Sequence, residues 1–159
     1  MTIMDLQQLA TVIPREGRLL GFDLGTKTIG LALSDVNRTI ASPLLALARG
    51  KFSTMADKIE SLIHEHGVGG LIIGLPISMD GSEGPRCQSA RQFAENMLER
   101  RDVPIAFWDE RLSTVAVERV LIGELDMTRK RRAEVVDKAA AAYILQGALD
   151  ALAYASRPA

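Results

Sequence analysis

The stretch FDLGTKTIGLALSD, residues 22–35, decides how the sheet of this chain begins. An apolar run over residues 18–24 carries Asp23 near its end, and a turn that contains Gly25 leads into a second strand-like run over residues 28–34. A third run, residues 39–47, follows the short segment DVNR. Because short turns between consecutive strands favour antiparallel pairing, the sequence predicts a three-stranded antiparallel meander.

Downstream of this meander the spacing of apolar residues changes from that of strands to that of helices and back again. The pattern predicts a helix from residue 52, a buried parallel strand over 70–76, a helix that starts near Pro85, a strand over 104–110, a short helix over 113–122, a charged loop over 123–132 and a long helix over 133–154. An antiparallel meander followed by strand–helix–strand crossovers predicts an α/β fold with a mixed five-stranded sheet flanked by helices.

The overall composition limits the possible locations and partners of the protein. A chain of 159 residues suits one domain, expected over residues 18–155, and residues 1–17 are expected to form a flexible, loosely attached extension. The single cysteine provides no disulfide framework, which favours a cytoplasmic location. The sequence shows neither a signal peptide nor a membrane segment. With a net charge of −1, any contact with nucleic acid must come from local basic patches.

Three acidic positions are candidates for a functional site. Asp23 stands at a strand end, Asp109 and Glu110 stand at another, and Asp137 lies on the apolar face of the last predicted helix. Since strand side chains alternate, only one of Asp109 and Glu110 can face Asp23, and alternation alone leaves both possible. Each acid also has an ordinary reading, as a turn aspartate, a solvated strand end or a carboxylate near a helix N-terminus.

If these acids converge, their chemistry indicates a metal site. Three carboxylates without a nearby thiolate or imidazole suit Mg²⁺ or Mn²⁺ rather than zinc. Two such ions can activate a water and stabilise the leaving oxygen when a phosphodiester is cleaved. The expected cofactor is therefore Mg²⁺ or Mn²⁺, as two ions.

Four segments of the chain together resemble a known family. FDLGTKTIGLALSD, LIIGLPISMDGSEGPR, WDERLST and VVDKAAAAYILQGAL are similar, in order and spacing, to the motifs of the YqgF family of ribonuclease H-like bacterial proteins, and the resemblance runs from about residue 18 to residue 152. The extension before residue 18 departs from the family core. The family is described as Holliday-junction resolvases and as pre-16S ribosomal RNA nucleases.

The resemblance implies a ribonuclease H-like fold and a nuclease that processes the 5′ end of pre-16S rRNA in ribosome biogenesis. It also implies that Asp23, Glu110 rather than Asp109, and Asp137 are the catalytic metal ligands. The expected partner is structured RNA, with a ribosomal precursor particle as its source, and branched DNA is the alternative. Cleavage of a junction requires two active sites and hence a homodimer. No long apolar surface helix indicates a dimer, so RNA is favoured and the protein is expected as a monomer or a homodimer.

Basic residues near these acids are candidates for contacts with nucleic acid. Free amides at a helix N-terminus also favour phosphate. The candidates are Lys27 beside Thr26 in the glycine turn, Arg86 at the start of a helix, Arg111, and Arg129, Lys130, Arg131 and Arg132 in the run TRKRR. Each has an alternative as an ordinary solvated residue, and Arg111 has a second one as the ion-pair partner of a neighbouring acid. Two other functions remain: a phosphotransferase, which needs a second such domain, and a binding module without catalysis.

Overall fold

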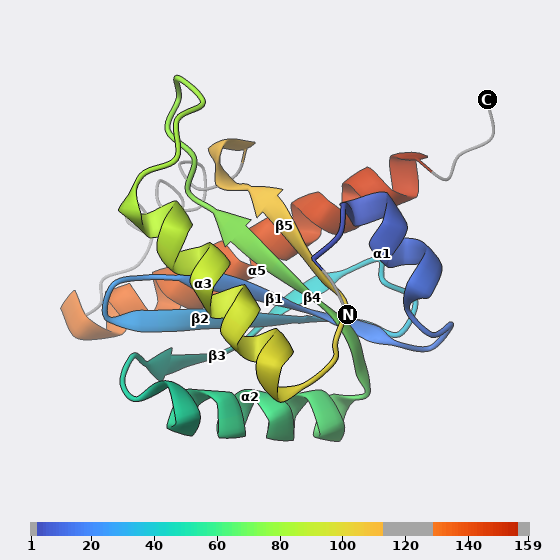
Figure 1. Cartoon of the computed structure of the whole chain (residues 1–159), viewed down its shortest axis with the longest axis horizontal. Helices are drawn as coiled ribbons and strands as arrows, with labels where there is room; N and C mark the ends of the chain where they lie inside the picture. Colours follow the sequence, from blue (N-terminus) through green and yellow to red (C-terminus); the bar gives the residue numbers. More distant parts are fainter. Residues whose placement is uncertain (1–2, 113–128, 156–159) are drawn as a thin grey trace.

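The computed structural model describes residues 3–112 and 129–155, with the backbone alone for residues 112, 129–137 and 155. One sheet runs through the molecule in the order β3-β2-β1-β4-β5 (Figure 1). The strands are β1 (Arg18–Leu24), β2 (Thr28–Ser34), β3 (Ala41–Ala48), β4 (Val68–Leu75) and β5 (Ile105–Asp109). β1, β2 and β3 pair antiparallel, whereas β4 pairs parallel with both β1 and β5. The predicted mixed five-stranded sheet is confirmed.

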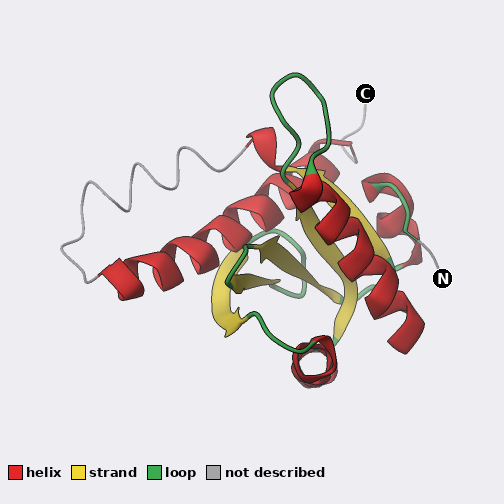
Figure 2. Ribbon diagram, turned by 60° about the vertical axis from the view of Figure 1, so that its left-hand side comes forward, coloured by secondary structure: helices red, strands yellow, loops and turns green. Residues whose placement is uncertain are grey.

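Helices cover both faces of this sheet (Figure 2). The helices are α1 (Leu6–Val12), α2 (Phe52–His66), α3 (Pro85–Arg100) and α5 (Arg129–Ala155), and a 3-10 turn, η1 (Glu110–Leu112), follows β5. α2 is capped by Gly67, whose φ of 63° is the left-handed conformation that glycine adopts without strain. α3 has Pro85 in its first turn, where no backbone N–H is needed.

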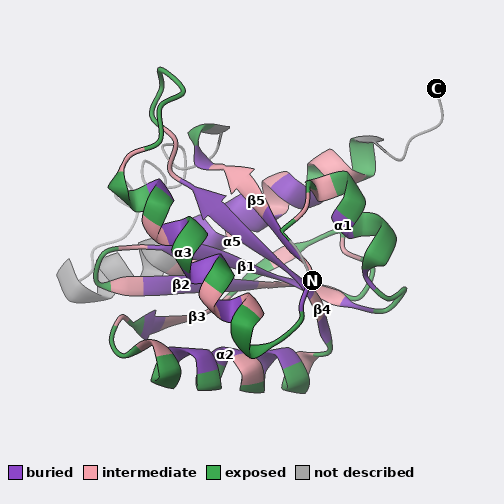
Figure 3. Cartoon of the chain, in the orientation of Figure 1, coloured by how far each residue is buried: buried purple, intermediate pink, exposed green. Residues whose placement is uncertain are grey.

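The sheet separates two hydrophobic cores. Apolar side chains of α2 and α3 pack on one face around Phe22 and Ile73, and those of α1 and α5 pack on the other around Leu19 and Ile72. Figure 3 shows the central strands as buried and the outer surfaces of the helices as exposed. Because β1 and β4 are covered on both faces, polar side chains on these strands need a specific environment.

The expectation that residues 1–17 form a loosely attached extension is wrong for the part that is described. α1 begins at a capping box in which Asp5 accepts from the Gln8 N–H and the Gln8 side chain accepts from the Asp5 N–H. Its Leu9 is fully buried in the core that α5 shares. Before α1, Ile3 bridges to Ile105 at the outer side of β5. The segment is therefore packed on the sheet, because it covers apolar surface that α5 leaves open.

The last helix begins earlier than the sequence predicted. α5 starts at Arg129, so the end of the expected loop over 123–132 is helical. Of the residues that were expected to share the apolar face with Asp137, Ala140, Ala141, Ile144 and Ala148 are buried and Leu152 is partly buried. The predicted helix over 113–122 lies outside the described residues. Among the described helices, none combines the length and the apolar content that a membrane span requires.

Candidate active site

Two of the predicted acids come together at the end of the sheet. Asp23 lies at the end of β1, and Glu110 is the first residue after β5. They are 9 % and 8 % exposed, and with Ser34 they are the buried polar or charged side chains of the described part. β4 lies between their strands, and a Cβ added to Gly74 would stand 2.9 Å from Cγ of Glu110. The glycine therefore leaves the space that the Glu110 side chain occupies.

The two carboxylates influence each other electrostatically. Burial raises the pKa of Glu110 to about 7, and the negative charge of Asp23 adds to the increase. The positive charge of Arg86 acts in the opposite direction, and Asp109 adds a smaller increase. A neighbouring negative charge disfavours the ionised form of a carboxyl group. The raised pKa of Glu110 therefore indicates that Arg86 does not fully compensate the negative charge of the site.

Asp109, the alternative to Glu110, has a different role in the structure. The Arg111 side chain donates to both of its carboxylate oxygens, from Nε at 3.0 and 2.9 Å, and the Arg111 N–H donates to Oδ1 at 3.0 Å. These hydrogen bonds hold the pKa of Asp109 below its usual range. In the structure Glu110 is buried and within the electrostatic range of Asp23, while Asp109 is engaged with Arg111. Which of the two would hold a metal ion stays a prediction.

The third predicted acid, Asp137, lies in α5, and its side chain is outside the described part. Asp137 precedes Ala141 by about one helical turn. A Cβ added to Gly21 of β1 would stand 3.3 Å from the Ala141 carbonyl oxygen, so α5 packs closely on β1 at Ala141. Among the described side chains, no three His, Cys, Asp or Glu residues gather closely enough to hold a metal ion. A ligand set of three acids therefore stays a prediction.

The donors that are described fit a hard divalent cation. Asp23 and Glu110 offer only carboxylate oxygens, and the one cysteine in the chain, Cys87, is buried in the opposite core. Burial and mutual repulsion disfavour the ionised forms of both carboxylates, and together they raise the pKa of Glu110. A bound cation would compensate these two effects. Mg²⁺ and Mn²⁺ bind such oxygen donors, whereas a thiolate or imidazole set suits zinc.

The predicted basic residues lie in different environments. Lys27 is exposed in the turn after β1, and Arg86 in the first turn of α3 donates to the Leu24 carbonyl at 3.3 Å. Arg111 pairs with Asp109, which was one of its two alternatives, and it keeps some exposure to solvent. The side chains of Arg129, Lys130, Arg131 and Arg132 are outside the described part, and their backbone forms the start of α5.

One residue of this region, Arg49, is not among those that the sequence predicted. It follows β3, and its guanidinium donates to the Gly25 carbonyl at 2.6 Å and to Ser89 Oγ at 2.9 Å. It lines a hollow of about 240 Å³ together with Leu24, Thr26, Pro85, Arg86 and Ser89. The pairing of β2 with β3 places Thr28 opposite Ala48, so a prediction of the strand register would have brought Arg49 beside the glycine turn.

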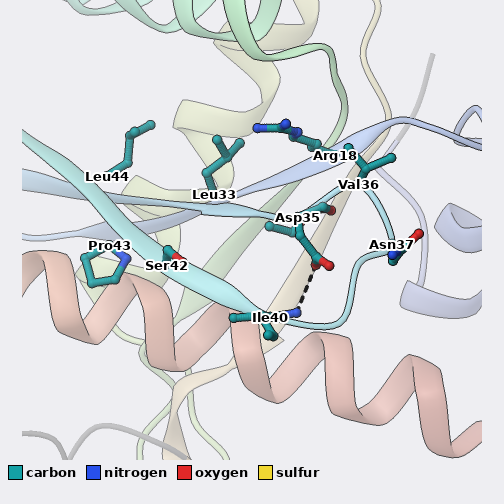
Figure 4. Close-up of a pocket in the computed structure, with 10 residues that line it drawn as sticks. Arg18, Leu33, Asp35, Val36, Asn37, Ile40, Ser42, Pro43 and Leu44 are labelled. Carbon is teal, nitrogen blue, oxygen red and sulfur yellow. Dashed lines mark hydrogen bonds between the residues drawn. The ribbon is translucent and has the colours of Figure 1, made fainter.

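A second hollow, of about 530 Å³, lies at the other end of the sheet near the start of β1 and the turn between β2 and β3 (Figure 4). Asp35 points into this region, but its carboxylate accepts from the N–H groups of Thr39 and Ile40 at 2.7 and 3.0 Å. These hydrogen bonds hold the pKa of Asp35 below its ordinary value. Asp35 thus stabilises the turn, and this hollow is separate from the buried acids.

Comparisons with known proteins agree with this arrangement. A family model for RuvX, described as Holliday junction resolvase, matches residues 17–151. A relative from Rhodospirillum rubrum named "Putative pre-16S rRNA nuclease" is 57 % identical over 152 residues, which are 96 % of this chain and 94 % of the relative. A relative of the same name from Paramagnetospirillum magneticum is 60 % identical over 150 residues, which are 94 % of this chain and 96 % of the relative.

A search of solved structures found the same fold. RuvC of T. thermophilus in complex with a Holliday junction substrate superposes with a TM-score of 0.52, over 85 % of this chain and 94 % of that chain. Its sequence is 13 % identical, so the similarity establishes a shared fold alone. The mixed sheet is thus that of ribonuclease H-like proteins, as expected.

Proposed function

The chain belongs to the RuvX (YqgF) family, and from this premise we propose that it is a metal-dependent nuclease that processes the 5′ end of pre-16S rRNA in the cytoplasm. The observation that carries the proposal is the pair of buried acids, Asp23 and Glu110, at the ends of β1 and β5, with the pKa of Glu110 raised to about 7. Buried acids with a strongly raised pKa gather at functional sites.

Asp23, Glu110 and Asp137 would hold Mg²⁺ or Mn²⁺. When bound, a pair of such ions supplies an activated water and stabilises the oxygen that leaves the phosphorus. The chain itself contributes the buried positions of Asp23 and Glu110 at the end of the sheet. Gly74 contributes the space for Glu110, and Arg86 supplies positive charge near the acids.

The basic residues would bring the phosphate backbone to these acids. Lys27 and Arg86 flank the end of β1, and the positive run at the start of α5 lies on the helix that carries Asp137. Arg111 is held by Asp109, and a phosphate contact from it remains an additional prediction. Contacts of this type position a strand without reading its sequence, so specificity for a precursor RNA must come from its shape or from a ribosomal particle.

The test is a cleavage assay on a pre-16S rRNA precursor with Mg²⁺, Mn²⁺ or a chelator. We expect cleavage with either ion, none with the chelator, and a loss of at least ~100-fold in Asp23→Asn, with its thermal melting retained. Asp150→Asn, the same change at an exposed position near the end of α5, is the matched control. Cleavage that persists in Asp23→Asn, or in the chelator, would contradict the metal-nuclease proposal.

Branched DNA is the second candidate substrate, because the family model that matches the chain carries the description Holliday junction resolvase. The same phosphodiester chemistry would act on both substrates. A four-way DNA junction assayed beside the RNA separates them, together with the molecular mass in solution, since symmetric junction cleavage requires two copies of the chain. Binding of RNA without cleavage of either substrate would favour a binding module.

A further inference from the structure

On the basis of the proposed nuclease function, we propose that a groove along α3, from the turn after β1 to the start of α2, binds one nucleotide of the substrate strand, next to the phosphodiester held at the acids. We call it the α2–α3 groove. It joins two hollows that share Arg49 and Ser89, one of about 240 Å³ lined also by Thr26 and Arg86, and one of about 290 Å³ lined also by Phe52, Gln92 and Asn96. The hollow of about 240 Å³ would bind the phosphate of the nucleotide, and the hollow of about 290 Å³ would bind its base.

The phosphate end of the groove holds two arginines from different elements. Arg49 follows β3, and Arg86 lies in the first turn of α3. Both guanidiniums are held by main-chain carbonyls at the end of β1, those of Gly25 and Leu24. Among the described residues neither forms an ion pair with a carboxylate, unlike Arg91 and Arg100. Two guanidiniums that main-chain carbonyls hold in place, beside the hydroxyl of Ser89, form a complementary site for a phosphate.

The base end of the groove combines an aromatic ring with two amides. The Phe52 ring is partly buried and packs edge-on against Phe93, with centroids 5.8 Å apart, so its position is fixed. Gln92 Nε2 donates to Asn96 Oδ1 at 2.9 Å, which orients both amides. An aromatic surface with oriented amide groups is the combination by which proteins bind an unstacked base.

The position of the groove relative to the acids follows from β1. Leu24 lines the groove, and Asp23 is the preceding residue, so their side chains point to opposite faces of the same strand. Between the two faces lies the turn at Gly25, where even a Cβ would meet the Thr28 carbonyl oxygen at 2.7 Å. A strand of nucleic acid that crosses this turn reaches the acids on one side and the α2–α3 groove on the other.

The test measures binding of two short probes in chelator, so that nothing is cut: an oligouridylate and an abasic ribose-phosphate chain of equal length. Arg49→Gln and Arg86→Gln should each weaken binding of both probes and flatten the slope of log K against log salt by about 0.7, the value for one lost phosphate contact on a single strand. Arg101→Gln, at the far end of α3, removes the same charge and should leave the slope unchanged. An unchanged slope in the Arg49 and Arg86 variants would overturn the phosphate site.

The base site is tested with Phe52→Leu and Gln92→Ala, whose folding is checked by thermal melting. Each should weaken binding of the oligouridylate, roughly fivefold or more for Phe52→Leu, with the salt slope unchanged and binding of the abasic chain unaffected. Equal losses on both probes would show a purely structural role and overturn the base site. A protein with these binding losses that cleaves neither RNA nor DNA would contradict the nuclease proposal and leave the groove in place.

Discussion

Burial and the charge of Asp23 act in the same direction on Glu110, so its carboxyl keeps a proton up to a pH of about 7. In the unfolded chain the same group loses its proton near its ordinary value of 4.5. Between these two pH values the folded state therefore binds more protons than the unfolded state. The free energy of unfolding must fall as the pH rises through this interval.

This gives a prediction for the protein without divalent metal. Glu110→Gln should remove most of the decrease in stability between about pH 5 and about pH 8, and it should make the protein more stable than the unchanged chain at the higher pH. The measurement is urea unfolding in chelator at both pH values. Asp109→Asn serves as the comparison, because the pKa of Asp109 is lowered and the group stays ionised at both pH values, so its loss should leave the decrease in place. A decrease that persists in Glu110→Gln would contradict the prediction.

Gly74 is a second residue where a small change has a specific consequence. In Gly74→Ala the new Cβ would stand 2.8 Å from Ile144 Cδ1 and 2.9 Å from Glu110 Cγ. Both atoms belong to side chains that can move, so stability should fall by no more than about 2 kcal/mol. Glu110 would be displaced, so RNA cleavage should fall by roughly 100-fold. Gly50→Ala, with nothing within 4 Å of its new Cβ, should leave the stability unchanged.

At the scale of elements, α1 is part of the fold rather than an appendage. Leu9 is fully buried, so Leu9→Ala should lower the free energy of unfolding by about 2–5 kcal/mol, measured by urea denaturation. Gln7→Ala, an exposed position on the same helix, should stay within about 0.5 kcal/mol of the unchanged protein. Equal stability of the two variants would mean that α1 does not contribute to the core.

The elements that the sequence predicted well are those with strong local signals. β1 and β2 have the predicted bounds, because apolar runs and short glycine or aspartate turns specify them. α1 was missed, although Asp5 and Gln8 have the spacing of a capping box and Leu6, Leu9 and Ile13 have helical spacing. The family resemblance alone favoured Glu110 over Asp109. β5 ends at Asp109 and a 3-10 turn begins at Glu110, and strand alternation does not predict such a turn. The position of Arg49 beside the glycine turn follows from the pairing register of β2 with β3, which local sequence patterns do not fix.

At the scale of the whole molecule, the net charge of −1 makes local charge decisive for nucleic-acid binding. The run Arg129, Lys130, Arg131 and Arg132 forms the first turn of α5, and this turn contains no acidic residue. Cations at a helix N-terminus oppose the helix dipole, so their presence has a cost for stability that a binding role would explain.

Replacing these four residues by glutamine should therefore weaken RNA binding and flatten its salt dependence, by about 0.7 to 0.9 in slope for each lost phosphate contact. The helix itself should be slightly stabilised, because the unfavourable charges at its start are removed. Binding titrations at several salt concentrations and thermal melting check the two effects. A slope equal to that of the unchanged protein would exclude the run from the binding surface.

The bridge from Ile3 to Ile105 has a consequence for how copies of the chain can associate. It covers the start of the outer side of β5, and the Met4 N–H donates to the Ile105 carbonyl at 2.9 Å. At the opposite edge, β3 contains Pro43, which cannot donate a ladder hydrogen bond, and its pairing with β2 shifts register there. Both edges thus resist extension by another strand, which protects the protein from edge-to-edge aggregation. Along the described strands an association that extends the sheet is therefore disfavoured, and a homodimer would meet through helices or loops.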